Sequence, residues 1–484
     1  MDTSSGNIHR AISLVWNRWP VLTGLFLFYY LIVKTVYFAY FSPLAKYPGP
    51  TLAKFTKFWQ LRVTLQKQGH HVYRELHAKY GPVVRIGPHS LSFDDARAVK
   101  AIYGSGAASF PRDSSFPAVG LNPDHLPVFF CIDGRAHQAA RRKVGSAYTM
   151  TSILGMEDRI DSIVGALQSR LDEAAENGGF MDISEWIGYF SFDVISDLAY
   201  GQAFGCLATG GDVNGIVSGL QNGFLFPVLF STFPGLFGAL FSVLGRVAKP
   251  PDDAGIGLAI KMANNIVNER YQRPSDKRDL LNAFIGSKDP DGIAIHRDQV
   301  RGEVIATLVA DVHARLQEEL STVTFDKEIP SFRQLQALPY LTAVIQETLR
   351  LSPSIGGAFI RRVAVGGAEV LPGQYVPGGT VVGVNNWVFG RNTNFYGPDA
   401  DQFRPQRWLE SDQKTKMMKN YEFSFGHGAR ICVGRNLALV ELYKVVFLLV
   451  HRYDITPLDS ANLYHEELKL FLNKTKMMVK MKKL

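Results

Sequence analysis

The ten residues 425–434, which read Phe-Gly-His-Gly-Ala-Arg-Ile-Cys-Val-Gly, constrain this chain more than any other stretch. They contain Cys432, one of only three cysteines. Two glycines ahead of it, Gly426 and Gly428, predict a tight turn in which no side chain prevents a flat cofactor from lying against the backbone. Gly434, just after the cysteine, allows a similarly close approach. We interpret Cys432 as a metal ligand; a structural thiol in a glycine-rich turn is the alternative.

The residues on either side of the thiol predict what it binds. From Asn436 the chain is apolar with few breakers, which indicates a buried helix whose first N–H groups would help hold the sulfur negative. Arg430, two residues before the thiol, can pair with an acidic group on the rim of a cofactor. A flat cofactor, one thiolate ligand and an arginine for a propionate together describe haem.

Composition excludes several other classes of protein. The chain has 484 residues, of which 46% are hydrophobic and 20% charged, as in folded rather than disordered proteins. The three cysteines form no C-x-x-C and indicate neither a disulfide framework nor a zinc site. The net charge of +8 is spread along the chain, which suits an acidic partner or an anionic membrane surface. No nucleic-acid-binding motif is found, so nucleic acid is not an expected partner.

An apolar run near the N-terminus predicts a membrane anchor. Residues 21–41 contain a single charge, Lys34, and are long enough to cross the hydrocarbon core. No small-residue cleavage site follows, which disfavours a removable signal peptide, and a buried core helix is the other alternative. Aromatic residues typical of membrane interfaces flank the run: Trp16, Trp19, Tyr37 and Tyr40.

The anchor divides the chain into four expected parts. Residues 1–20 form an N-terminal lumenal segment, 21–41 the transmembrane anchor, 42–50 a Pro/Gly hinge and 51–484 a haem-binding catalytic domain. More basic residues follow the anchor than precede it, so the positive-inside rule favours a cytoplasmic catalytic domain.

Residues 425–434 resemble the cysteine-ligand loop of the cytochrome P450 family at all its defining positions, and the resemblance covers nearly the whole chain. It implies a mainly α-helical fold with a small β-rich region after one N-terminal transmembrane helix. It also implies a membrane-bound monooxygenase of the endoplasmic reticulum that inserts one oxygen atom from O₂ into a hydrophobic small molecule. The cofactor would be haem b, with electrons from NADPH through a partner flavoprotein reductase. The matching residues are Phe425, Gly426, Gly428, Arg430, Cys432 and Gly434.

Within the family, the chain most resembles fungal secondary-metabolite members, whose substrates include terpenoids, polyketides and alkaloids. It does not name the molecule oxidised by this chain.

A second motif, Glu347-Thr348-Leu349-Arg350, lies in a helix expected to begin near Leu338. The two charged residues, Glu347 and Arg350, are three positions apart, so they share a helical face and can pair. The resemblance implies a buried structural triad behind the haem, completed by an arginine of residues 403–408. Arg407 is the better match and Arg404 the competitor.

Further residues match the family by their place in the chain. His137 and Arg141 lie four apart on one face of a predicted helix, and the resemblance implies that they bind a haem propionate; a solvated basic face is the alternative. Arg361, before a β-like stretch at 363–384, is the first choice for another propionate ligand. Residues 354–359 are expected to face the substrate. A reductase-docking face is predicted from basic residues, with a solvated surface as the alternative: Arg141, Arg142, Lys143, Arg435 and Lys444.

Residues 224–244 are nearly as apolar as the anchor but contain Pro227 and Pro234. The prolines would break a lipid-exposed helix. We therefore interpret the segment as partly buried or dipping into the membrane near the substrate entrance, rather than as a second spanning helix.

The oxygen-activating helix of the family is shortened in this chain. Residues 301–310 resemble its beginning, and 311–320 resemble the separate helix that follows it. A helix that crosses about 40 Å needs roughly 27 residues, whereas Asp298 to Ala310 supplies 13. We interpret this as a block lost at the Ala310–Asp311 junction, and no catalytic acid–threonine pair is assigned. The rival functions are a non-catalytic or inactive haem-binding membrane protein and a membrane protein without a cofactor.

Overall fold

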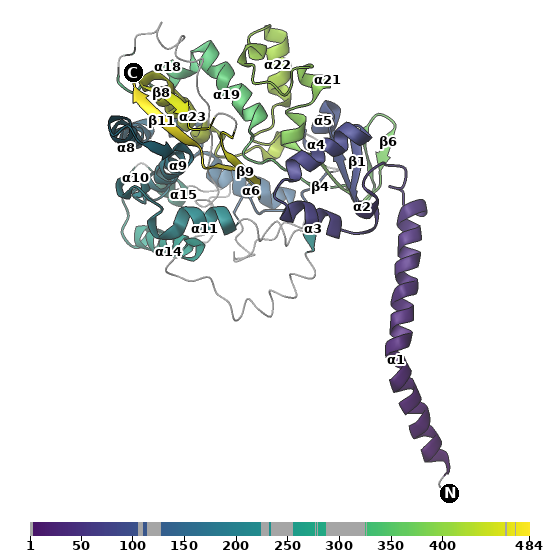
Figure 1. The fold of residues 1–484 in the computed structure, drawn as a ribbon. Coiled ribbons are helices and arrows are strands. Elements are labelled where there is room, and N and C mark those ends of the chain that lie inside the picture. Colours follow the sequence, from purple (N-terminus) through teal and green to yellow (C-terminus); the bar gives the residue numbers. More distant parts are fainter. Residues whose placement is uncertain are drawn as a thin grey trace.

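The computed structural model describes residues 3–104, 110–113, 127–223, 232–233, 255–275, 277, 279–286, 325, 327–459, 462–469 and 471–484. A mainly helical body carries a smaller β-rich part on the side from which the N-terminal helix projects (Figure 1). The predicted fold class is therefore confirmed. The Ala310–Asp311 junction lies outside the described residues, as does the segment 224–244 apart from Thr232 and Phe233.

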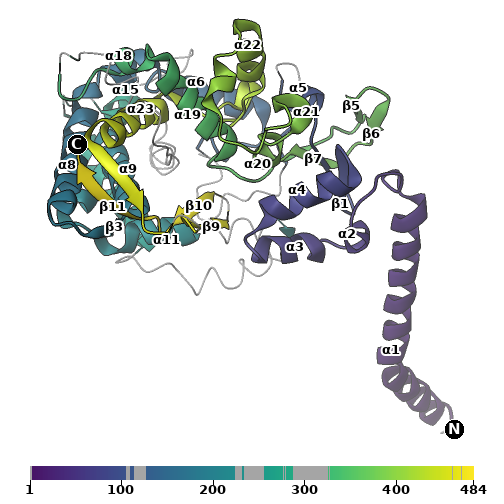
Figure 2. The ribbon, with the colours of Figure 1, turned by 45° about the horizontal axis from the view of Figure 1, so that its top comes forward.

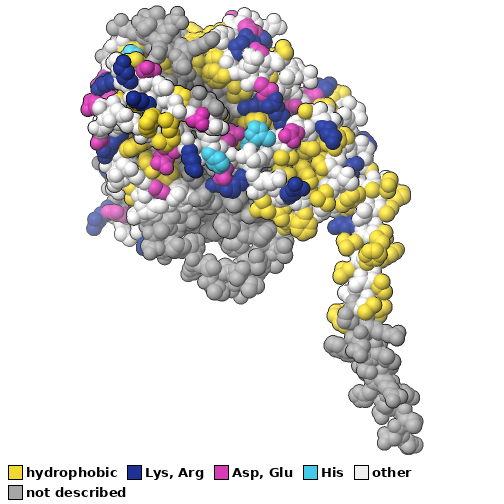
Figure 3. Space-filling view, viewed as in Figure 1, with side chains coloured by type: hydrophobic (Ala, Val, Ile, Leu, Met, Phe, Trp, Pro, Cys, Tyr) yellow, Lys and Arg dark blue, Asp and Glu magenta, His cyan; other side chains and the backbone are white. Residues whose placement is uncertain are grey.

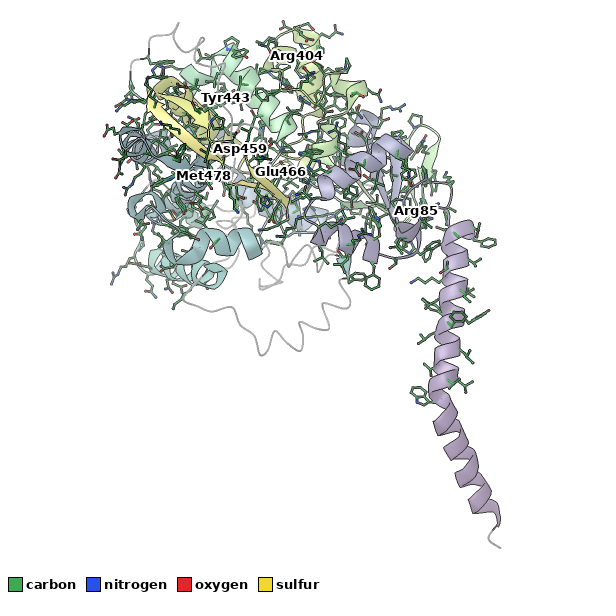
Figure 4. All side chains as sticks on the ribbon, in the orientation of Figure 1. Arg85, Arg404, Tyr443, Asp459, Glu466 and Met478 are labelled. Carbon is green, nitrogen blue, oxygen red and sulfur yellow. The ribbon has the colours of Figure 1, made fainter. Side chains whose placement is uncertain are left out.

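Helix α1 (Thr3–Val36) continues into a π-helical turn, η1 (Tyr37–Phe41), and stands away from the body (Figure 1). Val21–Phe41 is long and apolar enough to cross a membrane. Where η1 meets the body, Phe38 is buried and its carbonyl accepts a hydrogen bond of 3.0 Å from Arg85 Nη1. Arg85 is fully buried, and Figure 4 shows it beside the foot of α1. The N-terminal helix thus joins the body through a buried hydrogen bond between Phe38 and Arg85.

Apolar side chains cover the described part of α1 next to the body and continue onto the adjoining part of the body (Figure 3). The turn η1, α2 (Thr51–Phe55) and α3 (Phe58–Leu65) supply the exposed residues of this surface. They are Tyr40, Phe41, Leu52, Phe58 and Leu65.

Four short strands form a mixed sheet in the order β1-β2-β7-β4. β1 (Val83–Gly87) and β2 (Ser90–Phe93) are antiparallel and form a hairpin. β2 runs parallel to β7 (Val381–Val384), and β7 pairs with β4 (Arg361–Arg362) in the antiparallel sense. β5 (Ala368–Leu371) and β6 (Gln374–Val376) form a separate hairpin, and α5 (Ala96–Tyr103) packs against β5 and β7. These elements enclose one apolar core.

The larger core lies among long helices. α8 (Glu157–Glu176) and α9 (Ile183–Tyr200) each bury an apolar face. α23 (Arg435–Arg452) is the apolar helix predicted after the cysteine, and nearly all of its side chains are buried. Figure 2 shows α23 between the α8–α9 pair and α19 (Pro339–Leu351). Their apolar faces form one continuous core.

Shorter elements complete the described fold. The helices are α4 (Gly69–Tyr80), α6 (Gly134–Gly145), α7 (Met150–Leu154), α10 (Cys206–Thr209), η3 (Val213–Gly215), α11 (Ile216–Gly223), α14 (Gly255–Gln272), α15 (Leu280–Gly286), α18 (Phe332–Gln336), α20 (Asn386–Phe389), α21 (Thr393–Tyr396), η4 (Pro405–Trp408), α22 (Asp412–Tyr421) and η5 (Gly428–Arg430). The strands are β3 (Phe180–Asp182), β8 (Tyr453–Pro457), β9 (His465–Leu468), β10 (Leu472–Thr475) and β11 (Met478–Lys483). β3, β11 and β8 form a sheet, and β9 pairs with β10.

The cysteine segment lies where the two cores meet. Phe423 belongs to the core of the β-rich part, whereas Phe425 and Val433 pack against the helical core. The loop that carries Cys432 is thus held by both halves of the body.

Candidate functional site

The cysteine loop has the tight turn that its glycines predict. Gly426 and Gly428 have φ values of +78° and +63°, a region that residues with a Cβ rarely adopt. The Cys432 N–H donates to the Phe425 carbonyl at 2.7 Å and closes the loop. Gly434 does not have a positive φ: its value is −79°, which any residue can adopt. It lies directly before the first turn of α23.

The Cys432 thiol lies at the N-terminal end of α23. The backbone N–H groups of Gly434 and Arg435 favour the negative form of its sulfur. Burial nevertheless raises the pKa of Cys432 on balance, while these N–H groups and the charge of Arg141 oppose the rise. The thiol is surrounded by protein yet accessible, because it opens onto a cavity of about 680 Å³ between α6 and the cysteine loop. Ligand atoms can therefore reach the sulfur, and the N-terminus of α23 offsets part of the cost of its negative charge.

The predicted charge triad is formed. Arg350 makes a two-pronged ion pair with Glu347, with N–O distances of 2.7 and 2.8 Å. Arg407 Nε reaches Glu347 Oε1 at 2.9 Å, and all three side chains are fully buried. Arg404 is not the third member: its side chain is about one-third exposed and pairs with Asp399 and Glu410 (Figure 4).

Every lone pair of the Glu347 carboxylate has a donor. Besides the two arginines, the Arg404 backbone N–H and Trp408 Nε1 donate to it at 2.8 and 2.9 Å. Burial raises the pKa of Glu347, but hydrogen bonds and charges from Arg350, Arg404 N–H and Arg407 outweigh burial, so the net pKa is lowered. A buried carboxylate with this many donors stays ionised and holds η4 against α19.

The triad helix is tied directly to the cysteine loop. Ser424 Oγ donates to the carbonyl of Leu349 at 2.7 Å, one residue before Arg350. Phe423 packs on the rings of Tyr103 and Phe389, with centroids 5.8 and 5.7 Å apart. The position of the loop therefore depends on α19, as a structural role for the triad requires.

Basic side chains from four separate segments converge beside the loop. Arg430 donates to the carbonyls of Cys131 and Ile132 at 2.5 and 2.9 Å. Burial, followed by the nearby charge of Arg361, lowers the pKa of Arg430 to about 10. His137 is 3% exposed, and burial together with the charges of Arg430, Arg141, Arg112 and Arg361 lowers its pKa to about 4. Among the described residues, no carboxylate forms an ion pair with Arg361 or Arg430.

Arg141 also joins this group. Its Nη1 donates to the Ile431 carbonyl at 2.5 Å, next to the cysteine. The structure thus brings His137, Arg141, Arg361 and Arg430 together, as the sequence predicts.

Two residues of the site are not apparent from the sequence. Arg112 forms a β-bridge with Arg361, and burial and the charges of Arg430 and Arg361 lower its pKa to about 10. Tyr103 Oη donates to the Phe359 carbonyl at 2.7 Å and accepts from Val384 N–H at 2.8 Å. No local motif marks either residue, because both act through contacts with segments more than 200 residues away.

The predicted docking face cannot contain all five of its basic residues. Arg142 is exposed, and Arg141, Lys143 and Arg435 are half-buried. The assignment of Lys444 to this surface is wrong, because its side chain is fully buried and its Nζ pairs with Glu157 and Asp161 at 2.8 and 2.5 Å. Its periodicity places it on the inner face of α23, where its charge needs buried partners.

Comparisons with known proteins agree with this geometry. The family model described as Cytochrome P450 matches residues 48–313 and 310–481. The chain is 30% identical over 463 residues to a pisatin demethylase of Fusarium vanettenii, covering 88% of this chain and 86% of the relative. It is 31% identical over 450 residues to a cytochrome P450 monooxygenase of Aspergillus terreus, covering 86% and 91%. The cytochrome P450 monooxygenase gsfF of Penicillium aethiopicum is 30% identical over 471 residues, covering 90% and 92%.

Proposed function

The chain belongs to the cytochrome P450 family and is a monooxygenase of fungal secondary-metabolite type, and we propose from this premise that Cys432 is the axial ligand of its haem iron. The observation that carries the proposal is the place of Cys432 in a glycine-rich turn directly before α23, where its sulfur opens onto a cavity. The N–H groups of Gly434 and Arg435 and the charges of Arg141 and Arg435 favour the negative form of the sulfur, as a thiolate ligand requires.

The basic group beside the loop fits the rim of haem b. Two propionates would supply the anions that Arg361 and Arg430 lack among the described residues. His137 and Arg112 lie within electrostatic range of these two arginines, and Arg141 lies within range of His137. Arginine binds carboxylates with paired N–H groups, so these side chains would orient the macrocycle as well as hold it.

Once bound, haem supplies activation of O₂ for transfer of one oxygen atom to a substrate. The residues of this chain provide the surroundings for that chemistry. The N–H groups of Gly434 and Arg435 favour the negative form of the sulfur against the effect of burial. Gly426 and Gly428 keep the loop surface free of side chains. The Glu347–Arg350–Arg407 triad fixes the loop through Leu349 and Ser424.

The substrate class is a hydrophobic small molecule. One relative is named as a demethylase of pisatin, and other relatives are named as fungal monooxygenases. Residues 354–359 lie between the triad helix and β4, and the Phe359 carbonyl is fixed by Tyr103. We assign these residues to the substrate side of the site.

A membrane anchor accounts for the N-terminal part. Val21–Phe41 would span the bilayer, with 1–20 on the lumenal side and the domain of 51–484 on the cytoplasmic side of the endoplasmic reticulum. The apolar surface formed by Leu52, Phe58 and Leu65 would lie against the bilayer. Phe233, from the segment proposed to dip into the membrane, contacts Phe58 with a centroid distance of 5.2 Å. In this arrangement residues 42–50 are the junction rather than a free linker, because Leu44 and Tyr47 are buried.

Electrons would come from NADPH through a flavoprotein reductase bound to the basic surface of α6. Exposed Arg142 is the best test residue, because it lines the cavity that leads to Cys432. Arg142→Glu should slow NADPH-dependent haem reduction under carbon monoxide at least several-fold and leave reduction by dithionite unchanged. Lys480→Glu, a matched reversal on the C-terminal sheet, should have no effect. Equal rates for Arg142→Glu and the parent chain would place the docking surface elsewhere.

A second candidate function is haem binding without turnover. The family model matches in two pieces that overlap at residues 310–313, and the Ala310–Asp311 junction lies inside this overlap. This supports a block missing from the middle of the oxygen-activating helix. Sequencing the expressed transcript across these two codons tests it: a longer message that encodes an acid–threonine pair favours the working monooxygenase. If only the short message exists, the chain should bind haem but consume no NADPH above the background of the reductase.

A further inference from the structure

Three potential metal ligands meet outside the cysteine site, between the N-terminal turn of α4 and strand β9. His70 Nε2 lies 2.7 Å from Glu466 Oε1, and His71 Nε2 lies 3.6 Å from the same oxygen. One donor atom from each residue lies within 4.8 Å of the other two. Figure 4 shows Glu466 on the hairpin that faces α4. The triad and the cysteine loop use none of these residues.

The pair of His70 and Glu466 leaves part of its bonding capacity unused. His70 is completely buried, yet its Nδ1 has no hydrogen-bond partner among the described residues. Burying an imidazole nitrogen without a partner costs free energy. A metal ion bound through Nε2 would leave Nδ1 as it is, so the case for a metal site rests on the three donor atoms that lie within 4.8 Å of one another.

We propose that His70, His71 and Glu466 bind a divalent transition metal, with Zn²⁺ as the best fit. Two imidazoles and one carboxylate are a recurrent zinc set, with water at the fourth position. Tetrahedral bonds of about 2.0–2.1 Å place ligand atoms roughly 3.3 Å apart, so small side-chain rotations suffice. Metal binding requires both imidazoles in their neutral form.

Neighbouring groups already orient the ligands. Gln68 Nε2 donates to the Glu466 backbone carbonyl at 2.7 Å, and Lys474 Nζ lies 3.7 Å from Glu466 Oε2. Glu466 can thus give Oε1 to the metal while Oε2 faces the lysine. Trp387 packs edge-on against both imidazoles at 4.9 Å and limits their rotation. Such outer contacts raise metal affinity by fixing ligand direction.

The surrounding charges permit a cation. Arg391 stacks on Trp387 and Arg74 lies on the same helix as the histidines, but both arginines pair with Asp401. Lys474 is the other basic group that faces the cluster, and it is matched by Glu466 itself. Three basic side chains thus face two carboxylates, so the metal ion would bind through its direct ligand bonds against a small net positive charge.

The metal would join the β9–β10 hairpin to α4. The same hairpin reaches the segment after the triad helix: Leu472 N–H donates to the Ser354 carbonyl at 2.8 Å, and Lys474 Nζ donates to Ser352 Oγ at 2.7 Å. Fixing β9 on one side thus fixes residues 352–354 on the other. We assign the metal a structural role in holding this side of the substrate region.

Titration of the purified full-length holoprotein with Zn²⁺ tests the proposal by calorimetry. The expected result is one site, with His71→Ala weakening affinity at least 10-fold to 100-fold. His71 is half-exposed and makes no hydrogen bond shorter than 3.5 Å with Glu466, so its removal should leave the fold intact. His465→Ala is the matched control: it lies on the same hairpin, is also exposed, and faces Glu467 instead. This control should bind Zn²⁺ like the parent chain.

X-ray absorption at the zinc edge distinguishes the ligands. Nitrogen and oxygen scatterers with an imidazole pattern are expected, with the haem spectrum unchanged on zinc addition. Sulfur scattering, equal zinc affinity in His71→Ala and the parent chain, or no stoichiometric binding would each overturn the proposal.

Discussion

Gly428 lies so close to Tyr103 that a Cβ on the glycine would be 2.1 Å from the Tyr103 carbonyl oxygen. This contact joins the cysteine loop to the end of α5, and the φ of +63° at Gly428 independently favours glycine. The glycine is therefore required both by the backbone conformation and by the neighbouring chain.

Gly428→Ala should lower the free energy of unfolding by more than about 1–3 kcal/mol, the cost of left-handed strain alone, because the clash adds to it. It should also lower the haem content after purification. Gly165→Ala is the control, since a Cβ at this position in α8 meets nothing within 4 Å. Replacing glycine inside a helix should stabilise by roughly 0.5–1 kcal/mol. Urea unfolding measures both, and equal effects of the two variants would contradict the close contact.

The choice of Arg407 over Arg404 leads to a second prediction. Arg407→Ala removes one partner of a fully buried pair and should cost about 3–5 kcal/mol of unfolding free energy. Arg404→Ala removes exposed ion pairs and should cost about 1 kcal/mol or less, because its backbone N–H still binds Glu347. Chemical denaturation of the two variants, side by side, gives the comparison. The reverse order would make Arg404 the third member of the triad.

How much the sequence predicts depends on how local the information is. The cysteine loop, the Glu347–Arg350 spacing and the apolar helix after Cys432 are local patterns, and the structure has the expected turn, ion pair and helix. The predicted surface position of Lys444 is wrong, because the burial of a charged residue depends on partners from another helix. Here the partners are Glu157 and Asp161 of α8.

Other parts of the site depend on contacts between distant segments. Arg112 meets Arg361 across 249 residues, and Tyr103 fixes Phe359 across 256 residues. A single sequence carries no pattern for such contacts. The roles proposed for Cys432, Arg430, Arg361, His137 and Arg141 toward haem, and the four chain divisions, stay predictions.

His137 should make the stability of the haem-free protein sensitive to acid. Its ordinary pKa of 6.5 falls to about 4 in the folded state because of burial and the neighbouring arginines. Between these pH values the unfolded state binds more protons, so the free energy of unfolding rises with pH and is lost on acidification from 6.5 to 4. His137→Gln should show a smaller loss over this window in urea unfolding. An identical pH dependence in the variant would contradict the lowered pKa of His137 in the folded state.

Haem loading should weaken this acid sensitivity. Two propionate charges beside His137 would stabilise its protonated form and move its folded pKa back toward 6.5. The pH dependence of the holoprotein in the same window should therefore be flatter than that of the haem-free protein. A steeper dependence would place the propionates away from His137.

The arginines beside the loop should control how tightly haem is held. Arg361→Met and Arg430→Met each remove a charged donor to a propionate, which contributes about 1.5–3 kcal/mol. Each should speed haem transfer to apomyoglobin roughly 10-fold to 100-fold. Arg97→Met, which removes an exposed arginine paired with Asp95, is the control and should leave the transfer rate unchanged. Unchanged rates in the first two variants would exclude them as propionate ligands.

The most direct test of the account is the absorption spectrum of the reduced, carbon monoxide-treated protein. If Cys432 ligates the iron, the parent chain shows the Soret shift characteristic of thiolate ligation. Cys432→Ala should lose this shift, while Cys206→Ala, which removes a buried thiol remote from the loop in sequence, should keep it. Retention of the shifted band by Cys432→Ala would contradict the assignment of the cysteine.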